Sequence, residues 1–358
     1  MKTSLFNDTI ENIRAAAVII RDGGLVAFPT ETVYGLGADA LNSEAVSKVY
    51  AAKGRPSDNP MIVHIAETSE LAKLTNDINS DMRALMDAFW PGPMTMIVRR
   101  KDVVPDVTTG GLDTVGVRLP SSEVARTLIR ESGCPIAAPS ANISGRPSPT
   151  TAEHVIHDLY GRIDGIICGE DCDFGIESSV IDMTCETPMI LRPGAITCEM
   201  FSEALGREVA VDQSLFKRPQ NILDPEKVED TGTPTDEDFH PRSPGMKYKH
   251  YSPQAQVYIV KADDLEGFAE RVDSLCEDNA KKGLKIGVMT MNYDQHSYQA
   301  KVFDLGGSDT EVAKNLFDSL ISLDREYIDI AYVPYFEERG IGVAIMNRLK
   351  KAAAYRII

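Results

Sequence analysis

Four basic side chains stand within or directly after apolar segments of this sequence, and they are Lys53, Arg55, Arg118 and Arg192. Lys53 and Arg55 belong to the segment KGRPSDNP (53–60), which its two prolines stiffen. Taken singly, each cation is most often a surface ion pair. Taken together with a magnesium ion, they match a triphosphate of about four negative charges plus one amino-acid carboxylate. The pattern predicts a site for anionic ligands.

Serines and a histidine near these cations add hydrogen-bonding groups. Ser140-Ala141-Asn142 and Ser178-Ser179 lie outside any Gly-x-Ser-x-Gly elbow, and no histidine–carboxylate partner is evident for them. We interpret them as donors to phosphate or carboxylate oxygens rather than as hydrolase nucleophiles. His64 is either a core histidine or, beside an anion site, a donor to a carboxylate or a transferring group.

Two patterns point more weakly to cofactors. GLGADA (35–40) matches a loose dinucleotide-binding pattern, which needs glycine directly after a strand and at the start of a helix. Here the strand should stop at Pro29 and the helix should open near Ser43, so we expect no organic cofactor. His154 and His157, three apart on a helix, could ligate a metal, but we interpret them as part of an exposed helix face. The cysteines include no Cys-x-x-Cys pair, and we expect no metal held by the protein alone.

The elements that would position the cations alternate between strands and helices. A loop of small and hydroxyl residues at 30–37 follows an apolar strand at 25–28, and Ser43 should cap a helix ending near Gly54. Further helices are expected at 10–21, 81–90, 123–131 and 152–160, and strands at 61–65, 94–99, 114–119, 135–140, 166–167, 180–183 and 189–191. Several of these strands end in hydroxyl or cationic residues, where α/β folds tend to bind ligands.

Length and charge limit the kind of protein. A chain of 358 residues favours two domains. Its net charge of −17 argues against tight, non-specific nucleic-acid binding, which depends on lysine and arginine. The N-terminus has no long apolar region, and no run approaches the roughly 18 apolar residues of a membrane span. We expect a soluble, cytoplasmic protein that does not contact a membrane.

The composition changes after about residue 212. Residues 219–241 are rich in Pro, Asp and Glu and are predicted to be a linker. The segment RSPGMKYKHYSP (242–253) is basic and aromatic, and it is either an ordinary docking segment or a lid over a ligand. Beyond it, strands at 257–260, 286–289 and 328–333 alternate with helical patterns, which is typical of a Rossmann-like sandwich. This part has no phosphate-binding loop, so we expect a supporting role for it.

Longer motifs resemble the threonylcarbamoyl-AMP synthase family. In the first part of the chain they are PTETVYGLG (29–37), KGRPSDNP (53–60), IVHI (62–65), WPGPMT (90–95), LDTVGVRLP (112–120), PIAAPSANISGRPSPT (135–150), ESSVID (177–182) and LRPG (191–194). SPGMKYKHYSP (243–253) resembles the interdomain linker of the two-domain members, and residues 255–358, including ERGIGVAIMNR (338–348), resemble their C-terminal domain. The acidic segment 222–240 is the part of the chain that least resembles this family.

The resemblance implies an α/β fold and an activity. Residues 1–211 would form a YrdC-like domain with a twisted mixed sheet and a cationic groove, 212–254 a linker acting as a lid, and 255–358 a smaller Rossmann-like domain. The enzyme would be a nucleotidyltransferase that makes threonylcarbamoyl-AMP and pyrophosphate from L-threonine, bicarbonate and ATP with Mg²⁺. The product would pass to the tRNA threonylcarbamoyl transferase machinery, with direct tRNA binding weak at most.

The resemblance also implies roles for single residues. Threonine would be held by Thr32, His64, Arg118, Ala138 and Ser178. ATP would be held by Arg55, Asn59, Thr114, Ser140, Ser148, Arg192 and, from the linker, Tyr248. Lys53 and Arg55 would be the catalytic cations, stabilising charge on the phosphates. We see no obvious protein nucleophile, so positioning and electrostatics would do most of the catalysis.

Two other functions remain to be weighed. The first is an RNA-binding or translation-regulating module, against which the net charge counts. The second is the carbamoyltransferase of hydrogenase maturation, which contains a similar domain. That enzyme would bring zinc-finger cysteine pairs and further catalytic domains, and this sequence has neither.

Overall fold

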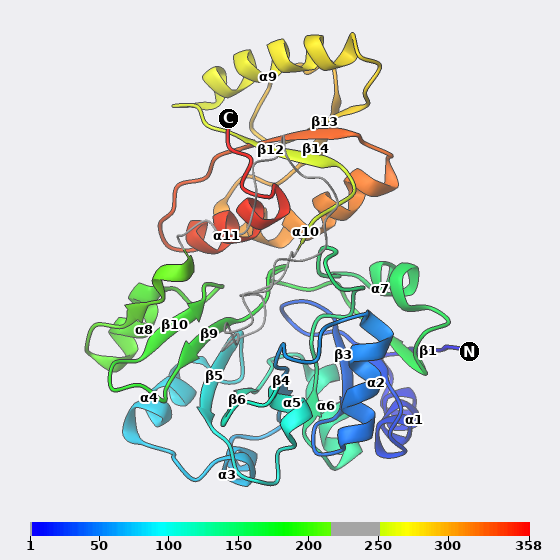
Figure 1. Cartoon of the computed structure of the whole chain (residues 1–358), viewed down its shortest axis with the longest axis vertical. Coiled ribbons are helices and arrows are strands. Elements are labelled where there is room, and N and C mark those ends of the chain that lie inside the picture. The colour runs from blue at the N-terminus through cyan, green and yellow to red at the C-terminus, as the bar shows by residue number, and fades with distance from the viewer. Residues whose placement is uncertain (1, 216–250) are drawn as a thin grey trace. The chain divides into compact units, whose positions relative to one another are not determined.

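The computed structural model describes residues 2–215 and 251–358. These residues form two compact units. The first unit contains residues 2–144 and 148–212, and the second contains 145–147, 213–215 and 251–358. Both units are α/β structures, as the sequence predicts (Figure 1). Most of the predicted lid, with Tyr248, lies outside the described residues.

The first unit is built on a mixed sheet of eleven strands, in the order β1-β8-β2-β3-β7-β4-β6-β5-β9-β10-β11. The strands are β1 (Ser4–Asn7), β2 (Val26–Phe28), β3 (Gly35–Asp39), β4 (Ile62–His64), β5 (Met94–Arg99), β6 (Thr114–Arg118), β7 (Ile136–Ala137), β8 (Gly165–Cys168), β9 (Ser179–Asp182), β10 (Met189–Arg192) and β11 (Ala210–Val211). The central pair β4–β6 is parallel, whereas β2–β3, β3–β7, β4–β7, β5–β6 and β9–β10 are antiparallel.

Where a helix was predicted in this unit, the observed helix begins and ends close to the predicted position. The helices are α1 (Ile10–Arg21), α2 (Ser43–Lys53), α3 (Leu71–Leu74), α4 (Ser80–Phe89), α5 (Asp106–Thr109), α6 (Glu123–Ser132), α7 (Ala152–Leu159) and α8 (Cys198–Leu205), with a 3₁₀ turn at Thr68–Glu70. The prediction that Ser43 caps α2 was wrong, because Asn42 accepts hydrogen bonds from the backbone N–H groups of Glu44 and Ala45. Gly54 ends α2 in the left-handed conformation, with φ of 61°.

The predicted loop at 30–37 is shorter than expected, because Gly35 and Gly37 belong to β3. A Cβ atom on Gly37 would lie 2.8 Å from both Phe28 Cε1 and Ile136 Cγ2. The glycine therefore makes room for side chains of β2 and the neighbouring β7 rather than forming a turn. The edge strand β1 and helix α8 had no predicted counterpart. β1 is largely exposed and pairs with a segment far away in sequence, β8, so no local pattern marks it.

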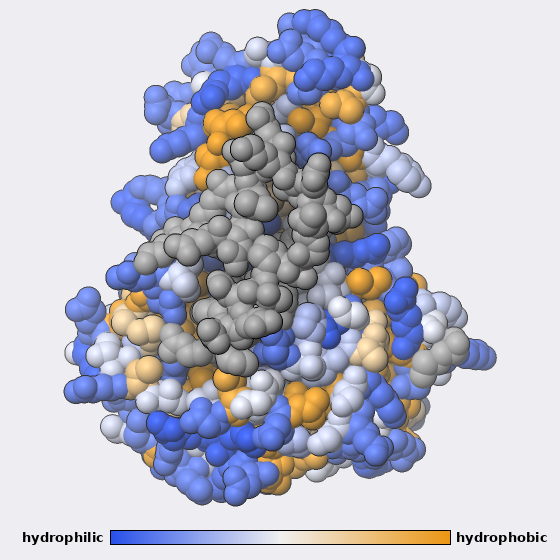
Figure 2. Space-filling model, viewed as in Figure 1, coloured by the Kyte–Doolittle hydropathy of each residue, from blue (hydrophilic) through white to orange (hydrophobic). Residues whose placement is uncertain are grey.

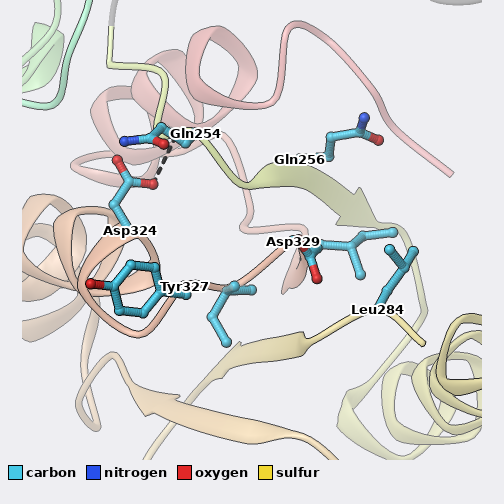
Figure 3. A pocket seen from close by; sticks show the side chains of 8 residues that line it. Gln254, Gln256, Leu284, Asp324, Tyr327 and Asp329 are labelled. Carbon is cyan, nitrogen blue, oxygen red and sulfur yellow. Dashed lines mark hydrogen bonds between the residues drawn. The ribbon is translucent and has the colours of Figure 1, made fainter.

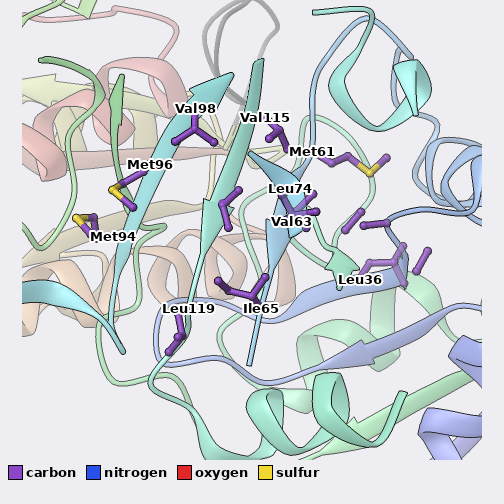
Figure 4. Close-up of a cluster of buried hydrophobic side chains, with 14 of the residues drawn as sticks. Leu36, Met61, Val63, Ile65, Leu74, Met94, Met96, Val98, Val115 and Leu119 are labelled. Atoms are coloured by element: carbon purple, nitrogen blue, oxygen red, sulfur yellow. The ribbon is translucent and has the colours of Figure 1, made fainter. Parts of the chain in front are cut away.

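A single large apolar cluster fills the middle of the first unit. Leu36 from β3, Val63 from β4, Met96 from β5 and Val115 from β6 all point into it (Figure 4). All four are 2% exposed or less. Burial of this kind is the main source of fold stability, at about 25 cal/mol per Å² of apolar surface. The packing of this cluster fixes the ends of the strands, and with them the polar residues at those ends.

The second unit has a four-stranded, fully parallel sheet in the order β12-β15-β13-β14. Its elements are β12 (Gln256–Val260), α9 (Leu265–Ala280), β13 (Ile286–Thr290), β14 (Lys301–Asp304), α10 (Asp309–Arg325), β15 (Ile330–Pro334) and α11 (Gly342–Ala352), with a 3₁₀ turn at Gln213–Leu215. Helix α9 covers one face of the sheet and α10 and α11 cover the other (Figure 1). This is the predicted Rossmann-like sandwich, with β14 as an additional edge strand.

Candidate active site

Three neighbouring strands bring a row of polar side chains to one level of the sheet. Arg118, the last residue of β6, lies opposite His64 on β4 and opposite Thr95 on β5. All three are buried. A strand end surrounded by apolar core is an expensive place for an arginine unless it has a partner.

That partner is Glu31, which the sequence reasoning missed. Its Oε1 atom lies 2.7 Å from Arg118 Nη2, and the two side chains are 2% and 5% exposed. Glu31 stands in the PTETVYGLG motif, between Thr30 and Thr32, of which only Thr32 was assigned a role. The only signal in the sequence was a carboxylate in an otherwise apolar and hydroxyl-rich segment.

A second group of contacts joins Ser178 to Arg192. Arg192, the last residue of β10, donates from Nη2 to Ser178 Oγ at 3.0 Å and from Nε to Ser178 O at 3.0 Å. Ser178 Oγ also lies 2.8 Å from Thr95 Oγ1. Thr95 is the register partner of Arg118, and Val180 is that of both Thr95 and Arg192. The two arginines Arg118 and Arg192 therefore stand at the same level of the sheet.

Lys53, the last residue of α2, is buried and holds the segment after β7. Its Nζ donates to the carbonyl oxygens of Ser140 and Asn142, the latter at 2.6 Å. Burial, together with the nearby Arg55, lowers the pKa of Lys53 well below its usual value. In this structure Lys53 thus positions Ser140, and its predicted action on phosphate stays a prediction.

Arg55 and Asn59 lie together in the loop between α2 and β4. Arg55 Nη2 donates to the carbonyl oxygens of Asn59 at 3.2 Å and Pro60 at 2.9 Å. Tyr50 also donates to the Asn59 carbonyl, at 3.0 Å. The buried Oδ1 of Asn59 accepts no hydrogen bond from any described residue. These contacts stiffen the loop and leave an acceptor inside it.

The remaining assigned residues are placed as follows. Thr32 Oγ1 lies 2.9 Å from Thr30 Oγ1, and Ser148 Oγ donates to Glu177 Oε1 at 2.7 Å. Ala138 donates from its backbone N to Ile62 O of β4 at 2.9 Å. Thr114 opens β6, and Tyr248 lies outside the described residues.

The strand register places four of the assigned residues at two different ends of β4 and β6. The strands run parallel, with Ile62 opposite Gly116 and His64 opposite Arg118. Asn59 and Thr114, both assigned to ATP, therefore stand where the strands begin, and His64 and Arg118, assigned to threonine, where they end. At about 3.3 Å per residue, Thr114 and Arg118 are roughly 13 Å apart along β6. That spacing suits two ligands bound side by side.

The electrostatics of the site keep His64 neutral. Burial, with the nearby Arg118 guanidinium, lowers the pKa of His64 from 6.5 to about 3. Its Nδ1 lies 3.2 Å from Ile62 O. A neutral imidazole beside a fixed guanidinium donates or accepts a hydrogen bond without adding charge. No group of three or more His, Cys, Asp or Glu side chains that could hold a metal occurs among residues 2–215 and 251–358.

The second unit offers a pocket of a different character. It is lined by Gln254, Gln256, Leu284, Asp324, Tyr327, Ile328, Asp329 and Ile330 (Figure 3). These residues lie at the beginnings of the parallel strands, whereas ligands of such sheets bind at their carboxyl ends. The two carboxylates accept backbone hydrogen bonds, Asp324 from Gln254 at 2.7 Å and Asp329 from Lys285 at 2.8 Å. Both carboxylates therefore hold backbone segments in place next to the strands.

The loop before α10 also carries no phosphate site. Its Gly307 N–H donates to Glu311 Oε2 at 2.7 Å, so a carboxylate of the same helix occupies the N-terminal position that a phosphate would take. Ser308 is the N-cap of α10, since its Oγ accepts a hydrogen bond from Glu311 N. The chemistry-bearing residues thus gather in the first unit.

Fold and site together define an α/β protein whose buried arginines and hydroxyl groups at strand ends suit anionic ligands. Family models agree with both units. One described as telomere recombination, of the Sua5/YciO/YrdC group, matches residues 18–194, and one described as the C-terminal domain of threonylcarbamoyl-AMP synthase matches 196–354.

Curated relatives give the particular family. The threonylcarbamoyl-AMP synthase of Pyrococcus abyssi is 45% identical over 97% of this chain and 95% of its own length. That of Bacillus subtilis is 44% identical over 97% of this chain and 94% of its own. The chain belongs to the threonylcarbamoyl-AMP synthase family and is an enzyme.

Solved structures are similar over the whole chain or over part of it. The crystal structure of P. abyssi Sua5 complexed with L-threonine matches with a TM-score of 0.88 and 43% identity, over 100% of this chain and 99% of that one. E. coli YciO matches with a TM-score of 0.51 and 25% identity, over 56% of this chain and 99% of its own. No described helix is long and apolar enough to cross a membrane.

Proposed function

We propose that this protein is an L-threonylcarbamoyladenylate synthase, which makes threonylcarbamoyl-AMP and pyrophosphate from L-threonine, bicarbonate and ATP. The observation that carries the proposal is the buried Arg118 at the end of β6, beside a neutral His64. A guanidinium shielded from water is a strong receptor for a carboxylate, because it can donate two parallel hydrogen bonds. The P. abyssi relative is described as binding L-threonine, which supports the same ligand here.

The two ends of β4 and β6 would hold the two substrates. Threonine would bind at Arg118 and His64, with Thr32, Ala138 and Ser178 around it. ATP would bind from the other end, at Arg55, Asn59 and Thr114, with Ser140, Ser148 and Tyr248. It would reach towards the threonine end at Arg192, whose guanidinium contacts Ser178. Mg²⁺ would enter bound to the ATP phosphates, since it usually binds through one or two carboxylates plus substrate phosphates.

The reaction would depend on placement and charge rather than on a protein nucleophile. The ammonium group of bound threonine first loses a proton. The neutral amine then adds to CO₂ with loss of a second proton, or displaces water from bicarbonate, to give a carbamate. A carbamate oxygen attacks the α-phosphorus while pyrophosphate leaves. Arg55 and Arg192 would stabilise the charge that develops on the phosphates, with Lys53 adding to it or holding Ser140 in place. Holding both substrates along the same pair of strands removes much of the entropic cost of their meeting.

The remaining assignments extend the same proposal. Residues 1–211 would carry the catalysis, 212–254 would cover the labile product, and 255–358 would support them. The adenylate would be consumed by the tRNA threonylcarbamoyl transferase machinery, in the cytoplasm. An RNA-binding or translation-regulating role is not favoured, because the relatives are named as synthases and the net charge is −17.

Pyrophosphate release by the purified protein tests the reaction. Threonine and bicarbonate are each omitted in turn, with Mg²⁺–ATP present throughout. Release that requires both supports the synthase. Release without threonine would indicate an ATP pyrophosphatase or another acceptor, and no release from folded protein would favour the RNA-binding alternative.

A further inference from the structure

Glu31 has no assigned role, although it is paired with Arg118 of the proposed threonine site. Its carboxylate is 2% exposed and forms the ion pair with Arg118. Its backbone is fixed as well, since Glu31 O accepts a hydrogen bond from Phe174 N at 2.9 Å. The loop that carries it is tied by Thr30 Oγ1, which lies 2.9 Å from Thr32 Oγ1 and donates to Val33 O at 2.6 Å. The carboxylate is therefore held in a defined position.

The pair leaves much of its hydrogen-bonding capacity unused. Within the described part of the chain, neither Glu31 Oε1 nor Oε2 accepts a hydrogen bond, and neither Nε nor Nη2 of Arg118 donates one. Oε1 and Nη2 are close enough to attract each other, but they are not aligned as donor and acceptor. Buried charged groups are normally both paired and hydrogen-bonded, because an unsatisfied one is costly. The unused groups on both members point to a ligand with complementary donors and acceptors.

We propose that Glu31 receives the ammonium group of L-threonine while Arg118 receives its carboxylate. The inference rests on the proposed function and adds a second recognition residue to it. An α-amino acid is a zwitterion whose two charges are only a few bonds apart, so a carboxylate beside a guanidinium presents the matching pair of opposite charges. A carboxylate ligand at Arg118 alone would leave the buried site with an excess negative charge. The ammonium at Glu31 restores neutrality.

The competing explanation is that Glu31 only orients Arg118, and ligand analogues separate the two. (R)-3-Hydroxybutyrate is threonine without its amino group, and L-2-aminobutyrate is threonine without its hydroxyl. Glu31→Gln keeps the size of the side chain and removes its charge. Binding of each ligand to the full-length protein with Mg²⁺–AMP-PNP is measured by calorimetry, or for weak ligands by inhibition of pyrophosphate release.

The proposal expects Glu31→Gln to weaken L-threonine and L-2-aminobutyrate by about 10- to 100-fold each, the usual effect of losing one charge-assisted hydrogen bond. (R)-3-Hydroxybutyrate should bind the variant as well as the wild type or better, because a negative charge near its carboxylate is gone. Equal weakening of all three would mean that Glu31 acts only through Arg118, and would overturn the proposal. So would unchanged threonine binding. Weakening of threonine but not of L-2-aminobutyrate would assign Glu31 to the hydroxyl instead.

Controls keep folding and function separate from the inference. Glu70→Gln removes a carboxylate that caps the turn at Thr68–Glu70 and should leave the ranking of the three ligands unchanged. If Glu31→Gln does not fold, Glu31→Asp keeps the charge but withdraws it by one methylene, and it should weaken both amines relative to (R)-3-hydroxybutyrate. If wild-type protein binds no threonine at all, the proposed function fails before Glu31 is tested.

Discussion

At the scale of single residues, the buried pair of Arg118 and Glu31 ties stability to ligand binding. Removing two charges from water costs several kcal/mol per ion, which their attraction recovers only with good geometry and further hydrogen bonds. The pair lacks several of those bonds, so it is not an optimal stabilising device. A substitution of either member should therefore change both the free energy of unfolding and substrate binding, and the two effects have to be measured separately.

Arg118→Ala should raise the KM for threonine strongly and leave the KM for ATP within about twofold. The loss of a bidentate, charge-assisted contact predicts at least a 10- to 100-fold effect on threonine. Steady-state pyrophosphate release with each substrate varied in turn measures both constants. Equal losses for threonine and ATP would contradict the assignment of Arg118.

The same variant should be less stable, because Glu31 is left as an uncompensated buried charge. The expected cost is about 3–5 kcal/mol, which urea unfolding measures. Adding Glu31→Gln to Arg118→Ala should recover part of that loss. Arg99→Ala, at an exposed position on β5, is the matched control and should change neither stability nor either KM appreciably.

His64 predicts a dependence of stability on pH. Its pKa is lowered to about 3 in the folded protein by burial and by Arg118, against about 6.5 in the unfolded chain. Between these values the unfolded chain binds a proton that the folded protein does not, so stability falls as the pH falls from 6.5 towards 3. The slope is at most about 1.4 kcal/mol per pH unit.

His64→Gln should make that decline shallower, by about 2–3 kcal/mol between pH 6.5 and 4.5. Urea unfolding of wild type and variant at several pH values measures the difference. His157→Gln, at an exposed position on α7, serves as the control. If His64→Gln loses stability as steeply as wild type over this range, His64 does not stay neutral in the folded protein.

At the scale of elements, β3 shows how glycines can serve a sheet rather than a turn. β3 lies between β2 and β7 and pairs with both in antiparallel fashion. The side chains of Phe28 on β2 and Ile136 on β7 pack closely against Gly37. This packing places the PTET loop, and Glu31 with it, directly before a fixed strand.

Gly37→Ala should destabilise the protein by about 1–3 kcal/mol, the usual cost of forcing a methyl group into a filled core. The added Cβ would stand 2.8 Å from both Phe28 Cε1 and Ile136 Cγ2. Thermal or urea unfolding measures the change. Gly54→Asn is the control: Gly54 has φ of 61° with open space around it, and asparagine tolerates that conformation. A neutral Gly37→Ala would show that β2 and β7 yield easily.

At the scale of the whole molecule, charge governs which partners can approach. The chain carries a net charge of −17. In the view of Figure 2, hydrophilic residues cover most of the described surface, with apolar residues scattered between them. A protein of this charge repels a polyanion at long range, while a buried cationic site can still take a small anionic ligand.

We therefore expect little binding of tRNA by the enzyme alone. Filter binding with unmodified tRNA at about 150 mM salt should show no retention above the weak range typical of non-specific contacts, about 10⁻⁴ to 10⁻⁶ M. A basic tRNA-binding protein is the positive control. Tight retention that falls steeply with salt would mean that a basic surface outweighs the net charge, and would revive the RNA-binding alternative.

The sequence by itself determined most of the helices and strands around the site, the positions of the cations and the family. Apolar periodicity, caps and prolines act within a few residues, so α2 and its end at Gly54 could be predicted, as could Arg118 on its strand. Long ungapped motifs identified the family because their residue types and spacing are specific.

Only the tertiary structure decided which of these residues meet. The pairing of Glu31 with Arg118 and the hold of Lys53 on the Ser140 and Asn142 carbonyls join segments far apart in the chain. They follow from the strand order β2-β3-β7-β4-β6, which is set by the packing of whole elements. Local sequence patterns do not specify that order. The physical reason is that the partner of a buried charge is set by which strands and loops pack together, and these can be far apart in the sequence.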